Sequence, residues 1–275
     1  MNKKAPFLDR VARVFSKILN LLFVSKCVIC GDTSWDDGEM CPQCRKMWEA
    51  ARLSRCPVCG KTARGCTCRP ILLTSAKRLG DRYLSALTFY GKPDSEDERD
   101  IIVRRAVNQI KKSPDRRIIR FAARELSQEI LRYFVKAGEK PESWHICYPP
   151  RTKKRVRQFG FDQGRELAKE ISRYTGISHV NLFSKTGDEL QKTLRLPDRK
   201  RCAEKSLSLR KGAGTAGGKF IIVDDIITTG ATVNSCASLL IKNGASAVFP
   251  VCVSRTKARK RKVRRKPSDR PWFIR

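Results

Sequence analysis

Eight of the twelve cysteines in this 275-residue chain lie in one short stretch, with the spacing of metal ligands. Two cysteines separated by two residues present both thiolates from one turn, and two such turns complete the four-thiolate tetrahedron that structural zinc prefers. The pairs predict one or two structural Zn²⁺ sites. The first set is Cys27, Cys30, Cys41 and Cys44, and the second is Cys56, Cys59, Cys66 and Cys68.

The second cysteine set leaves its pairing open. Cys66 and Cys68 are separated by one residue, which is tighter than usual, so ligands could be interleaved between the two sets. Redox-active dithiols or disulfides are the less favoured alternative, because clustered thiols flanked by glycine and proline are typical of zinc ribbons. A filled four-thiolate site has no open coordination position, so we expect it to order a fold.

The second chemical constellation is the stretch FIIVDDIITTGATV at residues 220–233. In it, an apolar strand is predicted to end at Val223, and a polar turn then leads into a helix. Ligands of open α/β sheets bind beyond the carboxyl ends of strands, and helix N-termini bind phosphate through free amides. The turn residues predicted to bind phosphate are Thr228, Thr229, Gly230 and Thr232.

Two carboxylates, Asp224 and Asp225, precede that turn. They would repel a phosphate, and an ionised carboxylate only accepts hydrogen bonds. Vicinal sugar hydroxyls supply two donors, so we predict that the aspartates bind a ribose. The alternative, that they only cap a helix, is weak because a cap needs one such residue directly before the helix.

The elements that must position these residues follow from hydrophobic periodicity. Residues 27–68 have no period long enough to build a core, so metal is expected to order this small domain. Beyond it, strands and helices alternate, which predicts an α/β fold with a parallel sheet covered by helices on both faces. Strands are expected at 83–90, 144–148, 219–223 and 246–253, and helices at 99–112, 114–137, 162–174 and 232–244, with a basic loop after residue 148.

The chain therefore divides into four predicted parts. These are an amphipathic helix at 1–26, a zinc ribbon at 27–70, the α/β domain at 71–255 and a basic, disordered tail at 256–275. The apolar run near residue 20 is too short to span a bilayer, so no transmembrane span is predicted. A helix packed on its own protein is favoured over a membrane-surface anchor.

The formal net charge is +32, from 59 basic and 27 acidic residues. Such a surface attracts nucleic acid, phosphorylated metabolites and anionic lipid. The tail is equally consistent with a nucleic-acid arm and with a solubilising segment. Single cysteines inside apolar segments favour the reducing cytoplasm as the location of the chain.

The stretch VDDIITTGAT resembles the phosphoribosyl pyrophosphate (PRPP) loop of type I phosphoribosyltransferases. From about Leu21 to Arg255, the order of cysteine ribbon, YPPRTKKRVRQFGFDQGRELAKEIS, QKTLRLPDRKRCAEKSLSLR and PRPP loop resembles the ComF family of bacterial proteins. Phe159 and Asp162 replace the arginine and asparagine of the family's usual RGFNQ-like segment. The resemblance implies a type I phosphoribosyltransferase fold, PRPP as ligand, and a cytoplasmic role in natural competence with single-stranded DNA and other competence proteins, such as a DNA translocase.

Departure of pyrophosphate from PRPP needs cations and usually Mg²⁺. Arg151 and Lys154 follow the predicted strand 144–148, where the first loop of this fold would meet the pyrophosphate. Asp225 is the one candidate catalytic carboxylate, because it would lie beside the oxocarbenium-like ribose. No acceptor-binding signature is visible, so an active enzyme is not established. A metabolic phosphoribosyltransferase and a non-catalytic, PRPP-sensing nucleic-acid binder are the alternatives to a ComF-like competence factor.

Overall fold

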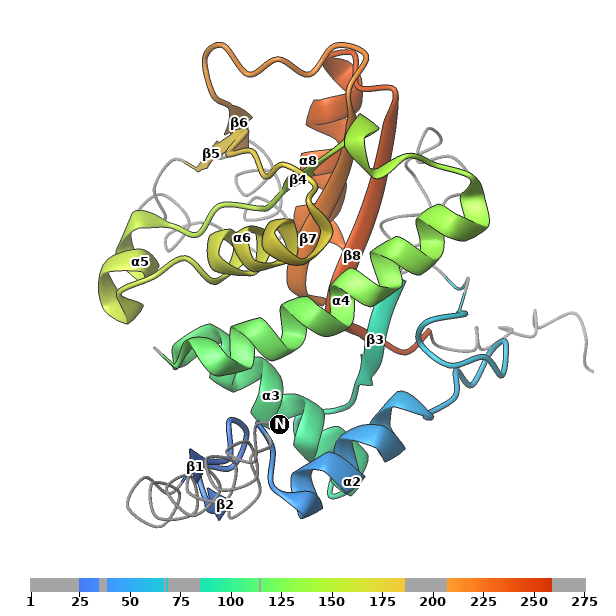
Figure 1. The fold of residues 1–275 in the computed structure, drawn as a ribbon, viewed down its shortest axis with the longest axis vertical. Helices are drawn as coiled ribbons and strands as arrows, with labels where there is room; N and C mark the ends of the chain where they lie inside the picture. Colours follow the sequence, from blue (N-terminus) through green and yellow to red (C-terminus); the bar gives the residue numbers. More distant parts are fainter. Residues whose placement is uncertain are drawn as a thin grey trace, which may run out of the picture.

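The computed structural model describes residues 25–34, 39–66, 68, 85–113, 115–185 and 207–258 (Figure 1). Most of the predicted N-terminal helix and the predicted tail beyond residue 258 lie outside the described residues. Among the helices in the described ranges, none has the length and apolar character needed to cross a membrane.

A four-stranded, fully parallel sheet forms the centre of the molecule. Its two central strands are long and almost continuously buried, as expected when both faces of a sheet are covered. This confirms the predicted parallel α/β fold. The strand order is β3 (Ser85–Tyr90), β8 (Ala247–Thr256), β7 (Lys219–Ile227) and β4 (Trp144–Cys147).

Alternating residues of β7 pack into two separate cores. Ile221 and Val223 contact the core formed with α3, α4 and α6, whereas Phe220 and Ile222 contact the core beneath α8. Helices therefore cover both faces, as predicted (Figure 1). The elements on the first face are α3 (Glu98–Lys112), α4 (Arg116–Ala137) and α6 (Gln163–Thr175), and those on the second are α8 (Ala231–Lys242) and the antiparallel pair β5 (Phe183–Lys185) and β6 (Leu207–Leu209).

The segment after β4 differs from the prediction. Instead of a basic loop, it contains the short helix α5 (Lys153–Phe159), which begins where the Thr152 hydroxyl accepts a hydrogen bond from the Arg155 amide. Gly160 ends the helix with a left-handed backbone, φ 75°, a conformation that glycine adopts without strain. A 3₁₀ turn, η2 (Pro141–Ser143), leads into β4.

The cysteine-rich region also differs, because it contributes to the hydrophobic core. It has a small antiparallel pair, β1 (Ser25–Lys26) and β2 (Thr33–Ser34), and the helix α2 (Pro42–Arg52). The α2 residues Met47, Trp48 and Ala51 are spaced three and four apart, so they share one buried face. The Trp48 ring packs edge-on against Phe121 of α4, with 5.5 Å between ring centroids.

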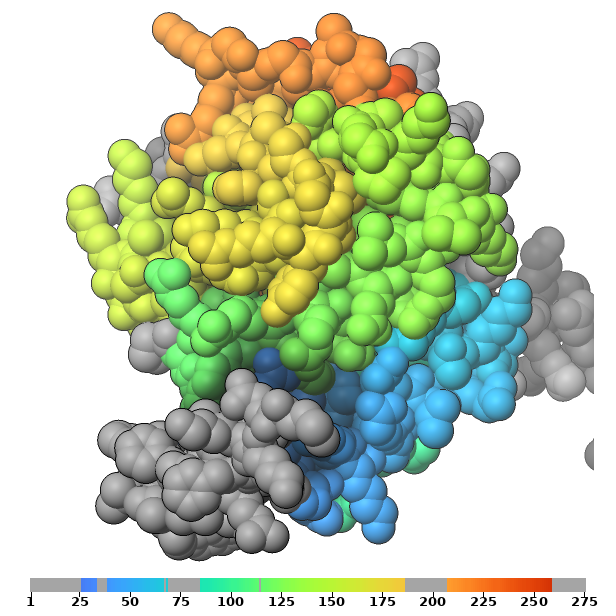
Figure 2. Space-filling model, viewed as in Figure 1, coloured from blue at the N-terminus to red at the C-terminus, as the bar shows by residue number. Residues whose placement is uncertain are grey.

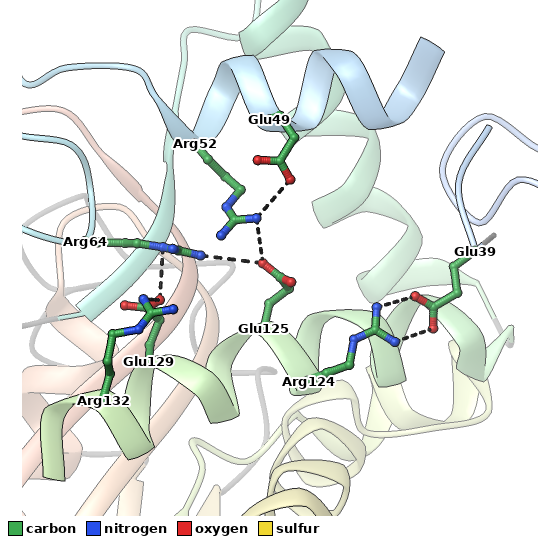
Figure 3. Close-up of polar contacts among 8 residues, drawn as sticks. All are labelled: Glu39, Glu49, Arg52, Arg64, Arg124, Glu125, Glu129 and Arg132. Carbon is green, nitrogen blue, oxygen red and sulfur yellow. Dashed lines mark hydrogen bonds and ion pairs between the residues drawn. The ribbon is translucent and has the colours of Figure 1, made fainter. Parts of the chain in front are cut away.

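The C-terminal end of α2 and the region that follows it also meet α4 through charge. Arg52 and Arg64 both approach Glu125, at 3.2 and 3.6 Å, and Arg64 also pairs with Glu129 at 3.0 Å (Figure 3). Both glutamates are buried. In the space-filling view, the blue and cyan atoms of the cysteine-rich region lie directly against the green atoms of the helices (Figure 2).

Candidate functional site

The sequence analysis had predicted that the strand ends before the two aspartates. In the structure they lie inside β7. β4 pairs with β7 only as far as Cys147 opposite Ile222, whereas β8 continues to pair with β7 up to Ile227. Asp224 and Asp225 therefore have a neighbouring strand on one side only. Strand β7 extends beyond its apolar residues because its backbone continues to form hydrogen bonds with β8 up to Ile227. The sequence pattern does not reveal this pairing.

One oxygen of each carboxylate is bound to the backbone. Asp224 Oδ1 accepts a hydrogen bond from the Asp225 amide at 2.9 Å, and Asp225 Oδ1 accepts one from the Ile226 amide at 2.7 Å. Asp225 Oδ2 is buried and accepts no hydrogen bond in the described part of the chain. Lys111 Nζ lies 3.7 Å from it, within ion-pair range. A buried carboxylate oxygen without a hydrogen-bond donor is energetically costly unless a ligand or a water molecule donates to it.

The surroundings of the pair disfavour two negative charges. Burial raises the pKa of Asp224 well above its usual value, and the charge of Asp225 raises it further. Burial also raises the pKa of Asp225, although the Lys111 ammonium group opposes that shift. Hydrogen-bond donors from a ligand would favour the ionised forms of both carboxylates.

The turn after β7 leads directly into α8. Thr228, Thr229 and Thr232 are exposed, and Gly230 occupies the N-cap position of α8 in a left-handed conformation, φ 76°. Because the cap residue is a glycine, the aspartates do not cap this helix. The Ala231 amide reaches Thr229 Oγ1 at 3.4 Å. The other first-turn amides have no intrahelical partner, which suits them to an anion.

Arg151 and Lys154 lie on different parts of the loop after β4. The Arg151 guanidinium donates to the Lys111 carbonyl at 2.8 Å and to the Phe161 carbonyl at 3.2 Å, and it lies over the Phe159 ring at 4.7 Å. It thereby joins the end of α3 to the loop before α6. Its Nε is buried and has no hydrogen-bond partner among the described residues. Lys154 is exposed on α5.

The two departures from the RGFNQ-like segment acquire structural roles. Phe159 provides the aromatic surface under Arg151. Asp162 caps α6 by accepting from the Gly164 and Arg165 amides, and its other oxygen accepts from the Arg151 amide at 3.1 Å. Both residues therefore help to hold Arg151 in place.

Lys111 is the residue of this site that the sequence did not reveal. It is the penultimate residue of an amphipathic helix, a position where a basic residue is common because it complements the helix dipole. With 59 basic residues in the chain, nothing in the pattern distinguishes Lys111 from its neighbours.

The eight cysteines form two separate clusters. Within each cluster, all four Sγ atoms lie within 4.8 Å of one another, so the ligands are not interleaved. The Cys30–Cys41 and Cys59–Cys66 sulfur distances are 3.8 and 3.6 Å, close to the sulfur separation of about 3.8 Å in a tetrahedron with Zn–S bonds of about 2.3 Å. The Lys61 backbone amide lowers the pKa of Cys59 to about 7, which favours a thiolate. Both donor sets fit structural zinc.

Comparison with known proteins agrees with this arrangement. Residues 160–273 match the phosphoribosyl transferase domain, and residues 18–72 match the double zinc ribbon domain. Competence protein ComFC of Streptococcus pneumoniae is 24% identical over 236 residues, which cover 81% of this chain and 96% of that protein. The chain combines a phosphoribosyl transferase domain with a double zinc ribbon and is similar to proteins of the ComF family. The predicted resemblance is confirmed.

A second relative of ComF type is DNA utilization protein YhgH of Salmonella typhi, 30% identical over 154 residues, or 54% of this chain and 66% of that protein. The chain thus spans just under two thirds of that relative. Among solved structures, a hypoxanthine-guanine phosphoribosyltransferase from Bacillus anthracis is 15% identical over 52% of this chain and 73% of that chain, with a TM-score of 0.34. So low a score adds nothing to the family matches. The predicted domain limits at 27–70 and 71–255 stay predictions.

Proposed function

We propose that this chain binds PRPP at the junction of β7 and α8 and acts in the handling of incoming single-stranded DNA in the cytoplasm. The observation that carries the first half is the buried Asp225 Oδ2, which has no hydrogen-bond donor among the described residues and belongs to the strand that leads into α8, whose N-terminus has no side-chain cap. The second half rests on charge and on the names of two relatives, a competence protein and a DNA utilization protein.

The number of available carboxylate oxygens supports a ribose diol as the ligand. Each aspartate has one oxygen bound to a backbone amide, which leaves Oδ2 of Asp224 and Oδ2 of Asp225. Two vicinal hydroxyls supply one donor for each of these oxygens. The 5-phosphate of the same ligand would then bind the turn from Thr228 to Thr232, with the amides of α8 as donors.

The pyrophosphate end of the ligand needs cations. In this proposal, Mg²⁺ arrives with the pyrophosphate, and Lys154 and the free Nε of Arg151 are the nearby basic groups on the loop after β4. A transfer reaction would develop positive charge on the ribose, and Asp225 beside the sugar would stabilise that charge electrostatically. A proton transfer by Asp225 is not required.

A basic cleft supports a nucleic-acid partner. A cavity of about 610 Å³ lies between the second cysteine cluster and α4, and its basic lining residues are Lys61, Arg64, Arg132 and Lys136. Glu129 lies among them, so the lining is positive in balance. Tyr133 and Phe249 stack on each other in the same lining, with 4.2 Å between centroids. The basic side chains of this lining suit the phosphates of a single strand, whereas the Phe249 ring is buried against Tyr133.

PRPP binding is tested by titration calorimetry with Mg²⁺, with Asp224→Asn and Asp225→Asn beside wild type and the exposed Asp94→Asn as the matched control. Loss of a charged acceptor should weaken binding by roughly 10-fold or more for each aspartate variant. The control should bind as wild type does. Unchanged affinity in both aspartate variants would contradict the site. Pyrophosphate release in the presence of a nucleobase panel would identify a metabolic transferase.

The same variants should stabilise the free protein at neutral pH. Because the native pKa values are raised, the native state binds more protons than the unfolded chain, and the free energy of unfolding falls as the pH rises from about 4 through those values. Asparagine does not ionise. Both variants should therefore unfold at a higher temperature than wild type at pH 7, and the difference should shrink toward pH 4. Equal melting temperatures at pH 7 would show that the carboxylates are not strained by burial.

DNA binding is tested by fluorescence anisotropy of a labelled single strand at several salt concentrations. Lys61→Ala with Lys136→Ala should reduce the slope of log affinity against log salt by about 1.4, for two lost phosphate contacts at about 0.7 each. The charge-matched control is Lys46→Ala with Lys140→Ala, two exposed lysines away from the cleft. Equal slopes in the two double variants would exclude the cleft as the binding surface.

A further inference from the structure

Arg255 is a buried cation near the C-terminal end of strand β8. It is the next-to-last residue of β8, and its exposed fraction is 1%. Arg255 is the single charged residue of β8, and a buried guanidinium is costly unless its donors are satisfied. Among the described residues no carboxylate forms an ion pair with it.

The donors of Arg255 go to the backbone of the second cysteine cluster. Its NH1 donates to the Cys66 carbonyl at 3.3 Å, and its NH2 donates to the Cys68 carbonyl. Its guanidinium lies 6.0 Å from the centroid of the Phe89 ring, and its Nε has no hydrogen-bond partner in the part of the chain that the structure describes. Two carbonyls that belong to metal-ligating residues are thus the main compensation for this charge.

The backbone next to Arg255 holds the turn of the candidate site. Arg255 is paired with Ile227 in the sheet, and Ile227 immediately precedes Thr228. The following residue, Thr256, donates its hydroxyl to the Thr228 carbonyl at 2.7 Å. Two consecutive residues at the end of β8 therefore make the contact to the cysteine cluster and the contact to the turn.

Zinc coordination would fix the carbonyls that Arg255 uses. Cys66 and Cys68 are both in the second donor set, so a metal bound there sets the path of the backbone between them. Without it, that segment loses its constraint, and a buried cation is left with partners that can move away. The end of β8 must then rearrange to solvate the guanidinium, and the Thr256–Thr228 contact lies on the segment that moves.

We propose that Arg255 is a positioning residue that couples zinc at the second cysteine cluster to the phosphate-binding turn, so that each stabilises the other. The part that concerns PRPP rests on the proposed function. Because coupling between two sites is reciprocal, zinc loss weakens PRPP binding, and PRPP strengthens zinc binding by the same factor. The charge on Arg255 carries the coupling through its two carbonyl contacts.

The first cysteine cluster provides a matched control. It reaches the α/β domain through apolar packing on α3 and α4, through a Gln109 side chain that donates to the Ile29 carbonyl at 3.4 Å, and through the Arg124–Glu39 ion pair at 2.6 Å. None of its described residues contacts the turn at residues 228–232. Cys30→Ser and Cys68→Ser each remove one ligand from a four-thiolate set, so they differ only in which cluster is broken.

The ligand-free test is hydrogen exchange of the amides at 228–233 in the full chain. Cys68→Ser should speed this exchange about 10-fold or more, within the usual range of coupling, and Cys30→Ser should leave it close to wild type. In a background of Arg255→Met, adding Cys68→Ser should cause little further change, because the carrier of the coupling is already gone. Arg255→Lys, which keeps the charge, replaces Arg255→Met if the latter does not fold, and it should show partial coupling.

The ligand-bound test measures zinc release to a chromogenic chelator with and without PRPP and Mg²⁺. In wild type, PRPP should slow release of one zinc of two, and in Arg255→Met it should slow neither. Equal effects of Cys30→Ser and Cys68→Ser on the turn, or additive effects of Cys68→Ser and Arg255→Met, would overturn the coupling. Failure of wild type to bind PRPP would overturn the proposed function instead, and the exchange experiment would still decide the coupling.

Discussion

The first cysteine cluster and its helix α2 pack against the α/β domain chiefly with Met47, Trp48 and Ala51, beside one Arg124–Glu39 ion pair. The second cluster adds buried charged contacts to its apolar packing, through Arg64, Arg255 and two glutamates. Both clusters have four sulfurs in similar geometry. Apolar packing tolerates small displacements of the partner, but a buried charge keeps its low energy only while its acceptors stay in place. The charged contacts of the second cluster therefore depend more strongly on the positions of their acceptors. This dependence suits them to transmit a structural change from the cluster to the sheet.

The largest expected effect comes from removing the apolar contact of the first region. Trp48 is 2% exposed, and Trp48→Ala should lower the free energy of unfolding by about 3–5 kcal/mol. The measurement is urea unfolding at low and high salt, and the loss should be the same at both. Leu53→Ala, at a 70% exposed position that follows the same helix, is the control and should change little. A loss that depends on salt would remove the distinction between the two attachments.

A smaller effect is expected from the charged contact of the second region. Glu125→Gln leaves Arg52 and Arg64 without their shared carboxylate, and it should lower the free energy of unfolding by about 1–3 kcal/mol. Glu49→Gln removes the exposed partner of the same Arg52, at 2.9 Å, and should cost less than about 1 kcal/mol. Hydrogen exchange should locate the Glu125→Gln effect in residues 54–66. If the two variants lose the same stability, the buried network does not hold the second region.

Local spacing was sufficient to predict much of this molecule. The four cysteine pairs, the parallel sheet and the turn of threonines before α8 each depend on residues close together in sequence. α2 was missed because its apolar residues are few and lie among cysteines already assigned to metal. Its buried face exists only because α3 and α4 supply the opposite surface, which no local pattern encodes.

The partners of the site residues could not be predicted for the same reason. Lys111 pairs with Asp225 across 114 positions of sequence, and one lysine among so many basic residues carries no distinguishing signal. Arg255 lies just beyond the predicted strand, which was expected to end at residue 253, so its burial within β8 was not predicted. The sequence also did not predict its hydrogen-bond acceptors, which are the carbonyls of Cys66 and Cys68.

The buried position of Arg255 also bears on how the protein can be divided. Cutting the chain before β3 would remove Cys66 and Cys68 and leave a guanidinium inside the sheet with no acceptors, while the apolar faces of α3 and α4 would be opened to water. The α/β portion produced alone should consequently aggregate or melt early. The two portions that sequence comparison separates are best regarded as one cooperative folding unit.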